Sequence, residues 1–322
     1  MLVLVTGGHG FIGSHLCERL VARGHRVRIL ARPDSALDNL AGLDVDVARG
    51  DLRDPGTLPA ALEGVERVYH LAGALKGFSE GALMAVNRDG TRNLVAACPA
   101  GLDRFVLVSS LAAAGPSPGG PEPRADDLPE APLTWYGRSK LEAERIVGAF
   151  PLPTVILRPP VVFGPRDRDV LSYFKLAGHG LLPVPGTLER YYSLVFAPDL
   201  ADGILKAGES PLPSGEILAL VNPAPVTWLD LGRRIAKALG RRSRELHLPE
   251  PAVQLAGQVA GLAACLRGRP GIFSPQKVRE MLAPAWVASP GKAQRLLGWT
   301  PATPLDQALW QTVRWYRDHA WL

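Results

Sequence analysis

Residues 2–23, LVLVTGGHGFIGSHLCERLVAR, decide the fold of this 322-residue chain. The segment begins with a continuous apolar run, which is typical of a strand buried on both faces of a sheet. It then turns through a glycine-rich segment, and from residue 14 onward apolar side chains recur at helical spacing. We therefore expect a strand over residues 2–7, a tight glycine turn and a helix over residues 14–23.

Strands and helices continue to alternate as far as residue 160. The further expected strands are residues 26–30, 45–51, 67–73, 104–110 and 154–160, and the expected helices are residues 57–62, 83–97 and 135–147. Continuous apolar strands separated by helices indicate a parallel sheet that is covered on both faces. Right-handed crossovers then give an α/β fold with a doubly wound parallel sheet, in which ligands bind at the carboxyl ends of the strands.

The glycine turn has the spacing of a phosphate-binding turn. Gly7 permits the tight turn, Gly10 lets the backbone approach a pyrophosphate, and Gly13 lets the helix pack close to the strand. The amino end of the helix offers free N–H groups and a partial positive charge to phosphates. A plain glycine turn is the alternative interpretation. Because a strand precedes the turn and a helix follows it, we expect dinucleotide binding through Gly7, Gly10, Phe11, Ile12 and Gly13.

The end of the expected second strand favours one dinucleotide over the other. NAD sites usually have an acid here that holds both ribose hydroxyls, but this chain has Ala31, Arg32 and Pro33. The Arg32 guanidinium can pair with a 2′-phosphate, so NADP is favoured over NAD. Two alternatives stay open: Arg32 is a solvated loop charge, or a shifted turn brings Asp34 to the ribose.

Asp51 and Leu52 follow the expected third strand. An acid at this place can accept a hydrogen bond from an adenine amino group, so we expect both residues beside the adenine. The alternative is that Asp51 caps a helix or lies in a loop.

Tyr136 and Lys140 are separated by four residues, so on a helix their side chains lie on the same face. A free tyrosine has a pKa of about 10, which is too high for acid–base work near neutrality. A neighbouring ammonium would stabilise the phenolate and lower that pKa. Tyr136 could then exchange a proton with an alcohol or ketone, while Lys140 also binds the nicotinamide ribose. Alone, the pair is better explained as an exposed helical pair.

A serine pair strengthens the catalytic interpretation. Ser109 and Ser110 end the expected fifth strand, at the carboxyl edge of the sheet, where a hydroxyl can hold a substrate oxygen. The glycine turn, the serines and the Tyr136–Lys140 helix occur in the order that one mechanism requires.

Together these segments resemble the extended short-chain dehydrogenase/reductases, also called the NAD-dependent epimerase/dehydratase family. The matching segments are TGGHGFIG (6–13), GDL (50–52), HLAG (70–73), VNRDGT (86–91), VSS (108–110), YGRSK (136–140), LRPPVVFGP (157–165) and GWTPATPLDQAL (298–309). They cover nearly the whole chain and are specific to the superfamily, but not to one reaction. Residues 247–275 are similar to inserts in hydroxysteroid dehydrogenases, dihydroflavonol reductases and hopanoid-associated epimerase-like proteins.

The resemblance implies a role for each matching residue. Tyr136 would be the catalytic base, Lys140 its partner and Ser110 the hydroxyl that positions the substrate, with Ser109 as the substitute. The implied cofactor contacts are Leu71, Ala72 and Gly73 in the turn after the fourth strand, Asn87, Ser109, Tyr136, Lys140, and the segment from Pro159 to Val162 beside the nicotinamide.

The chain departs from some branches of this family. Many sugar-nucleotide epimerases have a tyrosine where this chain has Ala114, and commonly an acid where it has Ala31. Leu111 and Ala112 stand where 4,6-dehydratases carry a threonine or an acid pair. These differences weaken an assignment as a UDP-sugar epimerase and argue against 4,6-dehydration.

The pattern changes after residue 165, where segments become shorter and proline is frequent. We expect residues 1–165 to form the dinucleotide-binding Rossmann domain, with residues 191–207 returning to the main sheet. Residues 166–322 would form mainly a substrate-binding lobe.

Two segments of that lobe have open interpretations. The apolar residues 252–266 suit the wall of a hydrophobic site or contact with a membrane surface, or they pack on the main domain or form a dimer contact. The charged residues 166–169 could meet an anionic substrate or form a solvated loop.

Composition narrows the class of protein. With 47% apolar and 21% charged residues the chain is typical of globular proteins, and its 36 Lys and Arg are scattered, so no nucleic-acid partner is expected. Cys17, Cys98 and Cys265 lie far apart, which indicates neither a disulfide framework nor a metal site. The chain begins directly with a strand pattern, and its most apolar later stretch is shorter than the about 20 residues of a transmembrane helix. We therefore expect a cytoplasmic protein.

Three functions remain at this point. The first is an NADP(H)-dependent oxidoreductase that interconverts a secondary alcohol and a ketone on a hydrophobic or cyclic substrate. The second is a nucleotide-sugar epimerase with tightly bound NAD(P), and the third is a non-catalytic cofactor-binding subunit. The helices expected over residues 83–97 and 135–147 often form a dimer contact in this family, so the resemblance implies a homodimer.

Overall fold

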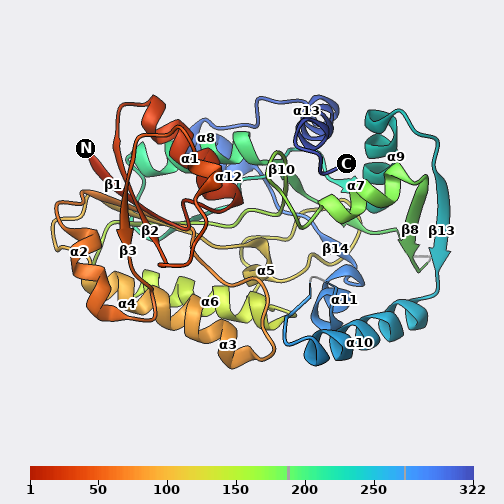
Figure 1. Ribbon diagram of the computed structural model, residues 1–322, viewed down its shortest axis with the longest axis horizontal. Coiled ribbons are helices and arrows are strands. Elements are labelled where there is room, and N and C mark those ends of the chain that lie inside the picture. Colours follow the sequence, from red (N-terminus) through yellow and green to blue (C-terminus); the bar gives the residue numbers. More distant parts are fainter. Residues whose placement is uncertain (187–188, 272) are drawn as a thin grey trace.

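A computed structural model describes residues 1–186, 189–271 and 273–322. Its centre is a seven-stranded sheet in the order β11-β6-β5-β4-β1-β2-β3 (Figure 1). The strands are β1 (Leu2–Thr6), β2 (Arg26–Ala31), β3 (Val45–Arg49), β4 (Arg67–His70), β5 (Arg104–Val108), β6 (Thr154–Leu157) and β11 (Glu216–Leu218). Every neighbouring pair is parallel, which confirms the doubly wound parallel sheet.

Helices cover both faces of this sheet (Figure 1). One face carries α1 (Phe11–Ala22) and α8 (Ala197–Glu209), and the other carries α2 (Leu58–Leu62), α3 (Glu80–Met84), α4 (Gly90–Ala97) and α6 (Trp135–Gly148). The short elements are η1 (Asp38–Leu40), η2 (Pro55–Thr57) and α5 (Leu111–Ala114). The core follows the pleat, because alternate side chains of a strand point to opposite faces. In β1, Val3 and Val5 pack with Leu16 of α1, whereas Leu4 packs with Phe105 and the other helical layer.

The helix expected over residues 83–97 is divided into three parts. A π-helical turn, η3 (Ala85–Asp89), separates α3 from α4. It buries Asn87, whose side chain binds the loop after β4. Such turns widen a helix locally and occur often at functional sites.

Residues 191–207, which were expected to return to the main sheet, pack against it mainly as a helix. These residues form β9 (Tyr191–Tyr192) and β10 (Leu194–Phe196), which pair outside the seven-stranded sheet, and then enter α8. Pro198 in the first turn of α8 favours helix over a longer strand. α8 packs against α1, and the strand that rejoins the sheet is β11.

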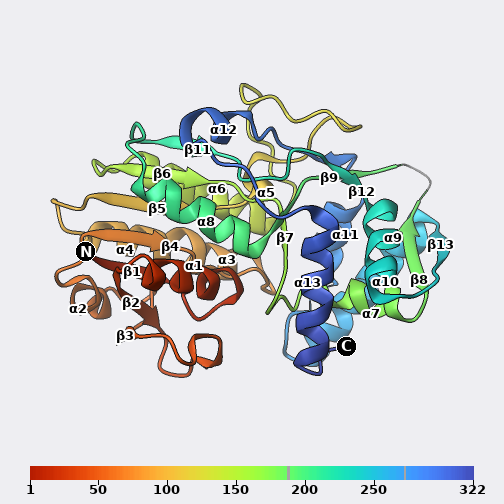
Figure 2. The ribbon, with the colours of Figure 1, turned by 90° about the horizontal axis from the view of Figure 1, so that it is seen from above.

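The rest of the chain builds a second group of elements beside the sheet (Figure 2). Its strands are β7 (Val161–Phe163), β8 (Leu181–Pro185), β12 (Val226–Thr227), β13 (Arg244–Leu248) and β14 (Ala285–Trp286). Its helices are α7 (Leu171–Gly178), α9 (Trp228–Leu239), α10 (Glu250–Leu266), α11 (Pro275–Met281) and α13 (Leu305–Asp318), while α12 (Gly291–Leu297) lies back against the main sheet. Phe163, Phe174, Trp286 and Tyr316 lie in a separate apolar core between these elements.

Candidate active site

The glycine turn between β1 and α1 has no room for side chains. Gly7 has φ +71°, and a Cβ on Gly13 would lie 2.1 Å from the carbonyl oxygen of Gly7. The Gly10 N–H donates to that same oxygen at 3.0 Å, which closes the turn. Gly10 precedes α1 and offers no side-chain cap, so the first N–H groups of the helix stay open to a ligand. This cradle fits the diphosphate of a dinucleotide.

Three basic side chains converge next to this turn. The Arg49 guanidinium donates to the carbonyl of Arg32 at 2.9 Å, so the ends of β2 and β3 are joined. Burial, followed by the charges of Arg32 and Arg49, lowers the pKa of His9 in the glycine turn. The acid nearest to Arg32 in sequence, Asp34, is exposed and lies 3.7 Å from its guanidinium. The sequence analysis identified Arg32 but missed His9 and Arg49.

Asp51 and Leu52, which follow β3, are bound by nearby side chains of the protein. Arg53 binds the carboxylate of Asp51 at 2.6 Å, and this hydrogen bond is the main cause of the lowered pKa of Asp51. Leu52 is buried against Gly90, and its carbonyl accepts from Asn93 at 2.9 Å. Asp51 therefore lies in a loop as one half of an ion pair.

A buried chain of hydrogen bonds fixes the turn after β4. The Thr91 hydroxyl donates to the Asn87 carbonyl at 2.5 Å, so it must accept from Nε2–H of His70, 2.9 Å away. Nδ1 of His70 then accepts from the hydroxyl of Thr6 at 2.6 Å, and that hydroxyl accepts from the Ala72 N–H at 3.2 Å. Burial lowers the pKa of His70 to about 3, so the ring is neutral, as this arrangement requires. The backbone of the Leu71–Ala72–Gly73 turn is thereby held beside the glycine turn.

Asn87 holds the next residue of the same loop. Its amide oxygen accepts from the Ala74 N–H at 2.7 Å, and its amide nitrogen donates to the Ala74 carbonyl at 2.9 Å. The same nitrogen donates to the hydroxyl of Ser139 in α6 at 2.8 Å. Asn87 therefore links the loop after β4 to the helix that carries Tyr136.

Ser110 and Tyr136 lie together at the carboxyl edge of the sheet. α6 begins at Trp135, where the Thr134 hydroxyl accepts from the Gly137 N–H at 3.1 Å. Gly137 packs directly on α5, because a Cβ there would lie 2.4 Å from the Ala112 carbonyl oxygen. This close approach brings the first turn of α6 to Ser110, whose side chain lowers the pKa of the Tyr136 phenol.

The pKa of the Tyr136 phenol differs from the expectation. Burial raises it to about 12, against the opposing effect of the Ser110 side chain, and the charges of Glu280 and Asp169 raise it further. The Lys140 ammonium donates instead to the carbonyl of Val108 at 2.7 Å. The expected lowering of the phenol pKa by Lys140 is therefore wrong for the protein alone.

Lys140 is buried one helical turn from Tyr136. Burial lowers its pKa to about 8, partly opposed by the charge of Glu144. The ammonium also lies near Gly73, since a Cβ there would be 3.8 Å from its nitrogen. Lys140 thus lies between the turn after β4 and the end of β5.

Ser109 has a different environment from Ser110. Its hydroxyl donates to the buried carboxylate of Glu144. Arg158 binds the same carboxylate at 2.6 Å. This network occupies the Ser109 hydroxyl, so Ser110 is the serine hydroxyl at the Tyr136 phenol.

The segment expected beside the nicotinamide runs along the same edge. The Pro159 carbonyl accepts from the Leu111 N–H at 2.8 Å, directly after Ser110. Val162 then pairs with Val195 in the β7–β10 ladder and packs on the core of the main sheet.

The charged residues 166–169 join the two parts of the molecule. Arg166, with φ +74°, donates to the Ser14 hydroxyl at 3.1 Å and binds Glu18 in α1. The buried Asp167 carboxylate accepts from the Asp169 and Val170 N–H groups, and burial raises its pKa to about 7. The side chains of Arg166 and Asp167 therefore bind other groups of the protein. This differs both from contact with an anionic substrate and from a solvated loop.

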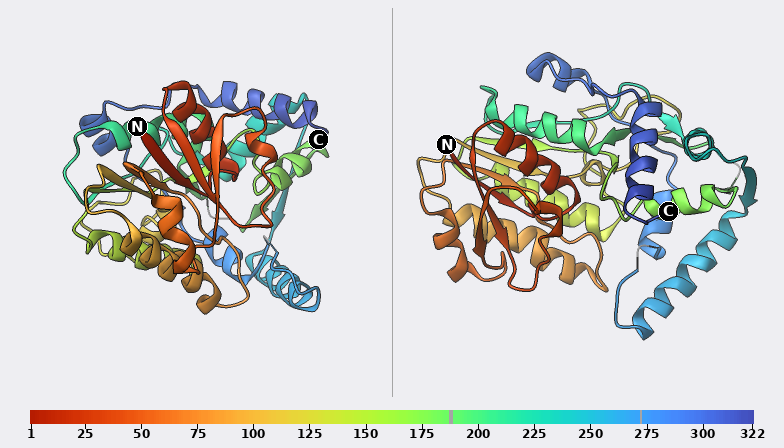
Figure 3. Two further views of the ribbon diagram at one scale, coloured as in Figure 1. Left: turned by 60° about the vertical axis from the view of Figure 1, so that its left-hand side comes forward. Right: turned by 45° about the horizontal axis from the view of Figure 1, so that its top comes forward.

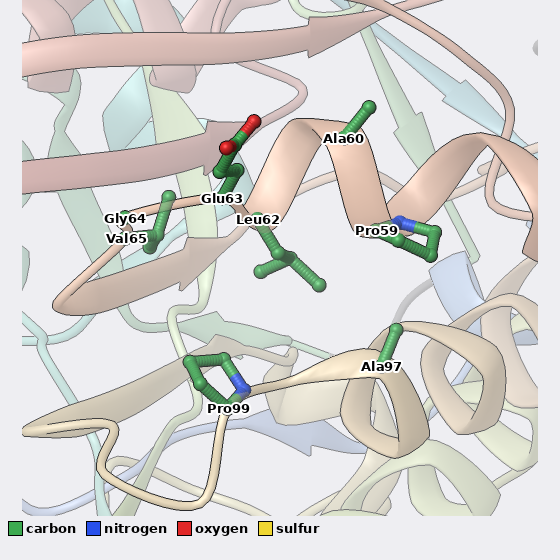
Figure 4. A pocket seen from close by; sticks show the side chains of 8 residues that line it. All are labelled: Pro59, Ala60, Leu62, Glu63, Gly64, Val65, Ala97 and Pro99. Atoms are coloured by element: carbon green, nitrogen blue, oxygen red, sulfur yellow. The ribbon is translucent and has the colours of Figure 1, made fainter.

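A surface hollow lies away from these residues. Figure 4 shows it between the end of α2 and the loop before β5, lined by Leu62, Val65 and Pro99 among others. Since β4 and β5 both begin there, it lies at the opposite edge of the parallel sheet from the glycine turn. Its lining is mainly apolar and offers no acid–base pair of the kind found at Tyr136.

These features define an enzyme that binds a nicotinamide dinucleotide. The chain belongs to the NAD-dependent epimerase/dehydratase family, whose family model matches residues 3–219. It is similar to the ceramide reductase of Caulobacter vibrioides (32% identical, over 100% of this chain and 96% of the relative). It is also similar to a 3β-hydroxysteroid dehydrogenase/Δ5→4-isomerase of Mycobacterium tuberculosis (29% identical, 98% and 90%). Among solved structures, the UDP-glucose 4-epimerase of Thermus thermophilus in complex with NAD matches with a TM-score of 0.79 (25% identical, 98% and 99%).

Proposed function

We propose that the protein reduces a ketone on a hydrophobic or cyclic substrate with NADPH, through Tyr136, Ser110 and Lys140. The observation that carries this proposal is the placement of Ser110, the Tyr136 phenol and the buried Lys140 at the sheet edge where the glycine turn opens. A phenol beside a hydroxyl donor suits a carbonyl oxygen that is becoming an alkoxide.

Each side chain has a separate task in this reaction. The nicotinamide, when bound, supplies the hydride to the carbonyl carbon. Tyr136 donates its proton to the carbonyl oxygen, and Ser110 donates a hydrogen bond that holds this oxygen. A phenol with its pKa raised to about 12 is protonated at neutral pH, so it holds the proton that ketone reduction requires. Lys140, with a pKa of about 8, is mainly an ammonium at pH 7 and can bind a ribose hydroxyl.

The basic cluster supports NADP over NAD. Arg32 and Arg49, at the ends of β2 and β3, act on His9 of the glycine turn and could pair with a 2′-phosphate on the adenine ribose. A phosphate dianion binds guanidinium groups in charge-assisted pairs, whereas a 2′-hydroxyl offers no such pairing. Asp51 binds Arg53, and the acid beside Arg32 is the exposed Asp34, which a phosphate could displace.

The substrate class rests on the similar proteins and on the second lobe. A ceramide reductase and a hydroxysteroid dehydrogenase are named for lipid and steroid substrates. In this chain the apolar helix α10 packs on α11, and α11 reaches the first turn of α6, where Gln276 accepts from the Trp135 N–H at 3.2 Å. A hydrophobic substrate is therefore the better fit to this side of the site.

The test is whether added cofactor is consumed in proportion to substrate. Purified protein is incubated with NADPH and a panel of long-chain and cyclic ketones, and loss of NADPH is followed together with alcohol formation. We expect stoichiometric consumption, and a loss of about 10²- to 10⁴-fold in kcat for Tyr136→Phe. Tyr191→Phe is the matched control, because its hydroxyl binds Glu189 instead.

The likeness to a UDP-glucose 4-epimerase favours a second candidate, an epimerase that retains its cofactor. Such an enzyme would invert a sugar hydroxyl with no net consumption of NADPH. Cofactor that copurifies with the protein, together with interconversion of nucleotide sugars, would replace the reductase proposal.

A further inference from the structure

Helix α10 presents an uncovered apolar stripe. Leu255, Val259, Leu262 and Leu266 are 66%, 60%, 66% and 83% exposed, respectively. Their spacing of four, three and four residues places them on one face of the helix. Figure 3 (right) shows α10 projecting from the edge of the molecule.

The opposite face of α10 is attached to the protein through close packing. A Cβ on Gly257 would lie 2.6 Å from Val278 of α11, and one on Gly261 would lie 3.0 Å from Pro275. Val253 and Ala264 are buried on this same side. The small residues therefore fix the helix with its leucines pointing outward.

Positive charge is in excess around the stripe, because the two flanking acids, Glu250 and Glu280, bind Arg190 and Lys277. Residues 251–279 contain Arg267, Arg269, Lys277 and Arg279 and no acidic residue. Arg267 and Arg269 are exposed at the end of α10, directly after Leu266. An apolar face with arginines at its rim is complementary to a bilayer with anionic headgroups.

Helix α11 connects α10 to the candidate catalytic tyrosine. α11, which supports α10, binds the backbone of Trp135 through Gln276, and the charge of Glu280 reaches the Tyr136 phenol. Figure 1 shows α10 and α11 beside the end of α6. A surface that bound α10 would thus lie next to the catalytic edge.

We propose that the α10 stripe, with Arg267 and Arg269, docks the protein on the surface of an anionic lipid bilayer, from which a hydrophobic substrate reaches Tyr136. The substrate clause rests on the proposed function, whereas the docking clause does not. In the part of the chain that the structure describes, no helix is long and apolar enough to cross a membrane. α10 is about 25 Å long, against a hydrocarbon core of about 30 Å, so it lies on the surface.

A second copy of the chain fits the α10 stripe less well than an anionic bilayer does. Two α10 segments that meet would bring together surfaces that both carry excess positive charge, which opposes association. The homodimer expected through α4 and α6 would also use a different surface and leave α10 uncovered.

Docking is measured by cosedimentation of the full chain with vesicles. One set contains phosphatidylcholine and phosphatidylglycerol, and the other contains phosphatidylcholine alone. We expect the wild type to bind the mixed vesicles. In Leu262→Ser/Leu266→Ser the affinity for these vesicles should fall about tenfold for each leucine replaced. In Arg267→Gln/Arg269→Gln it should fall about 30-fold. Leu296→Ser, a partly exposed leucine of α12, is the matched control and should bind like the wild type.

Three results would overturn the docking proposal. The first is that the wild type does not bind mixed vesicles, and the second is that Leu262→Ser/Leu266→Ser binds them as well as the wild type does. The third is that the wild type is a dimer, the leucine variant is a monomer, and neither protein binds vesicles. Turnover of a water-soluble ketone by the variant checks its fold. If no ketone consumes NADPH but vesicle binding behaves as expected, the proposed function fails and docking stands.

Discussion

Ser110 lowers the pKa of the Tyr136 phenol at the carboxyl edge of the sheet, although α5 and a long loop separate the two residues in the chain. The neighbouring Ser109 hydroxyl is instead bound to Glu144. Two adjacent serines thus have separate roles, one at the phenol and one in a buried ion-pair network. Replacing each serine in turn therefore separates an effect on catalysis from an effect on stability.

Ser110→Ala should lower kcat for ketone reduction by about a hundredfold, because a donor to the developing oxyanion is lost. Ser109→Ala should affect kcat far less. It should lower the free energy of unfolding by about 1–3 kcal/mol, because the buried Glu144 carboxylate loses a donor. Steady-state kinetics and denaturant unfolding of both variants measure these effects. A larger loss of kcat in Ser109→Ala than in Ser110→Ala would reverse the assignment.

Lys140 should make stability depend on alkaline pH. Burial lowers its pKa from 10.5 in the unfolded chain to about 8 in the folded protein. Between these values the unfolded state binds the extra proton, so the free energy of unfolding rises with pH, by about 3 kcal/mol in all. Below about pH 8 the cost of the buried charge is present in full, and above about pH 10.5 it has disappeared.

Lys140→Met should remove this rise, which is measured by urea unfolding at a series of pH values. Lys206→Met is the control, because Lys206 also donates to a carbonyl, that of Gly298, but is exposed. A variant curve parallel to that of the wild type would show that Lys140 keeps an ordinary pKa.

The basic cluster should set the cofactor preference. Arg32→Ser and Arg49→Ser should each reduce the ratio of kcat/KM for NADPH to that for NADH by about 10- to 100-fold, because each removes a charge-assisted pair to the 2′-phosphate. Arg26→Ser is the control, because Arg26 begins β2 at the other edge of the sheet and is exposed. Equal use of both cofactors by the wild type would contradict the preference.

The sequence predicted the parts of the fold that local pattern encodes. The apolar strands, the glycine turn and the short segment from Tyr136 to Lys140 are contiguous, so spacing alone places them. The predicted strands over residues 104–110 and 45–51 end earlier in the structure, at Val108 and Arg49, which leaves Ser109, Ser110 and Asp51 in loops.

Contacts between residues that are distant in the sequence could not be predicted from it. The chain from Thr6 through His70 to Thr91 crosses three elements, and its residue types have no diagnostic spacing. The phenol pKa rises because of burial, and the residues that add to the rise, Glu280 and Asp169, come from the second lobe. Such effects depend on tertiary packing, which periodicity does not contain.

The closest approach in the glycine turn gives the last prediction. A Cβ on Gly13 would lie 2.1 Å from the Gly7 carbonyl oxygen, which is backbone and cannot rotate away. Gly13→Ala must therefore push α1 from β1 and open the diphosphate cradle. We expect NADPH binding, followed by the fluorescence of the reduced cofactor, to weaken at least about tenfold, with a loss of about 1–3 kcal/mol in stability. Gly101→Ala, which has no atom within 4 Å of its added methyl, should change neither quantity. Wild-type cofactor affinity in Gly13→Ala would mean that the dinucleotide does not bind at this turn.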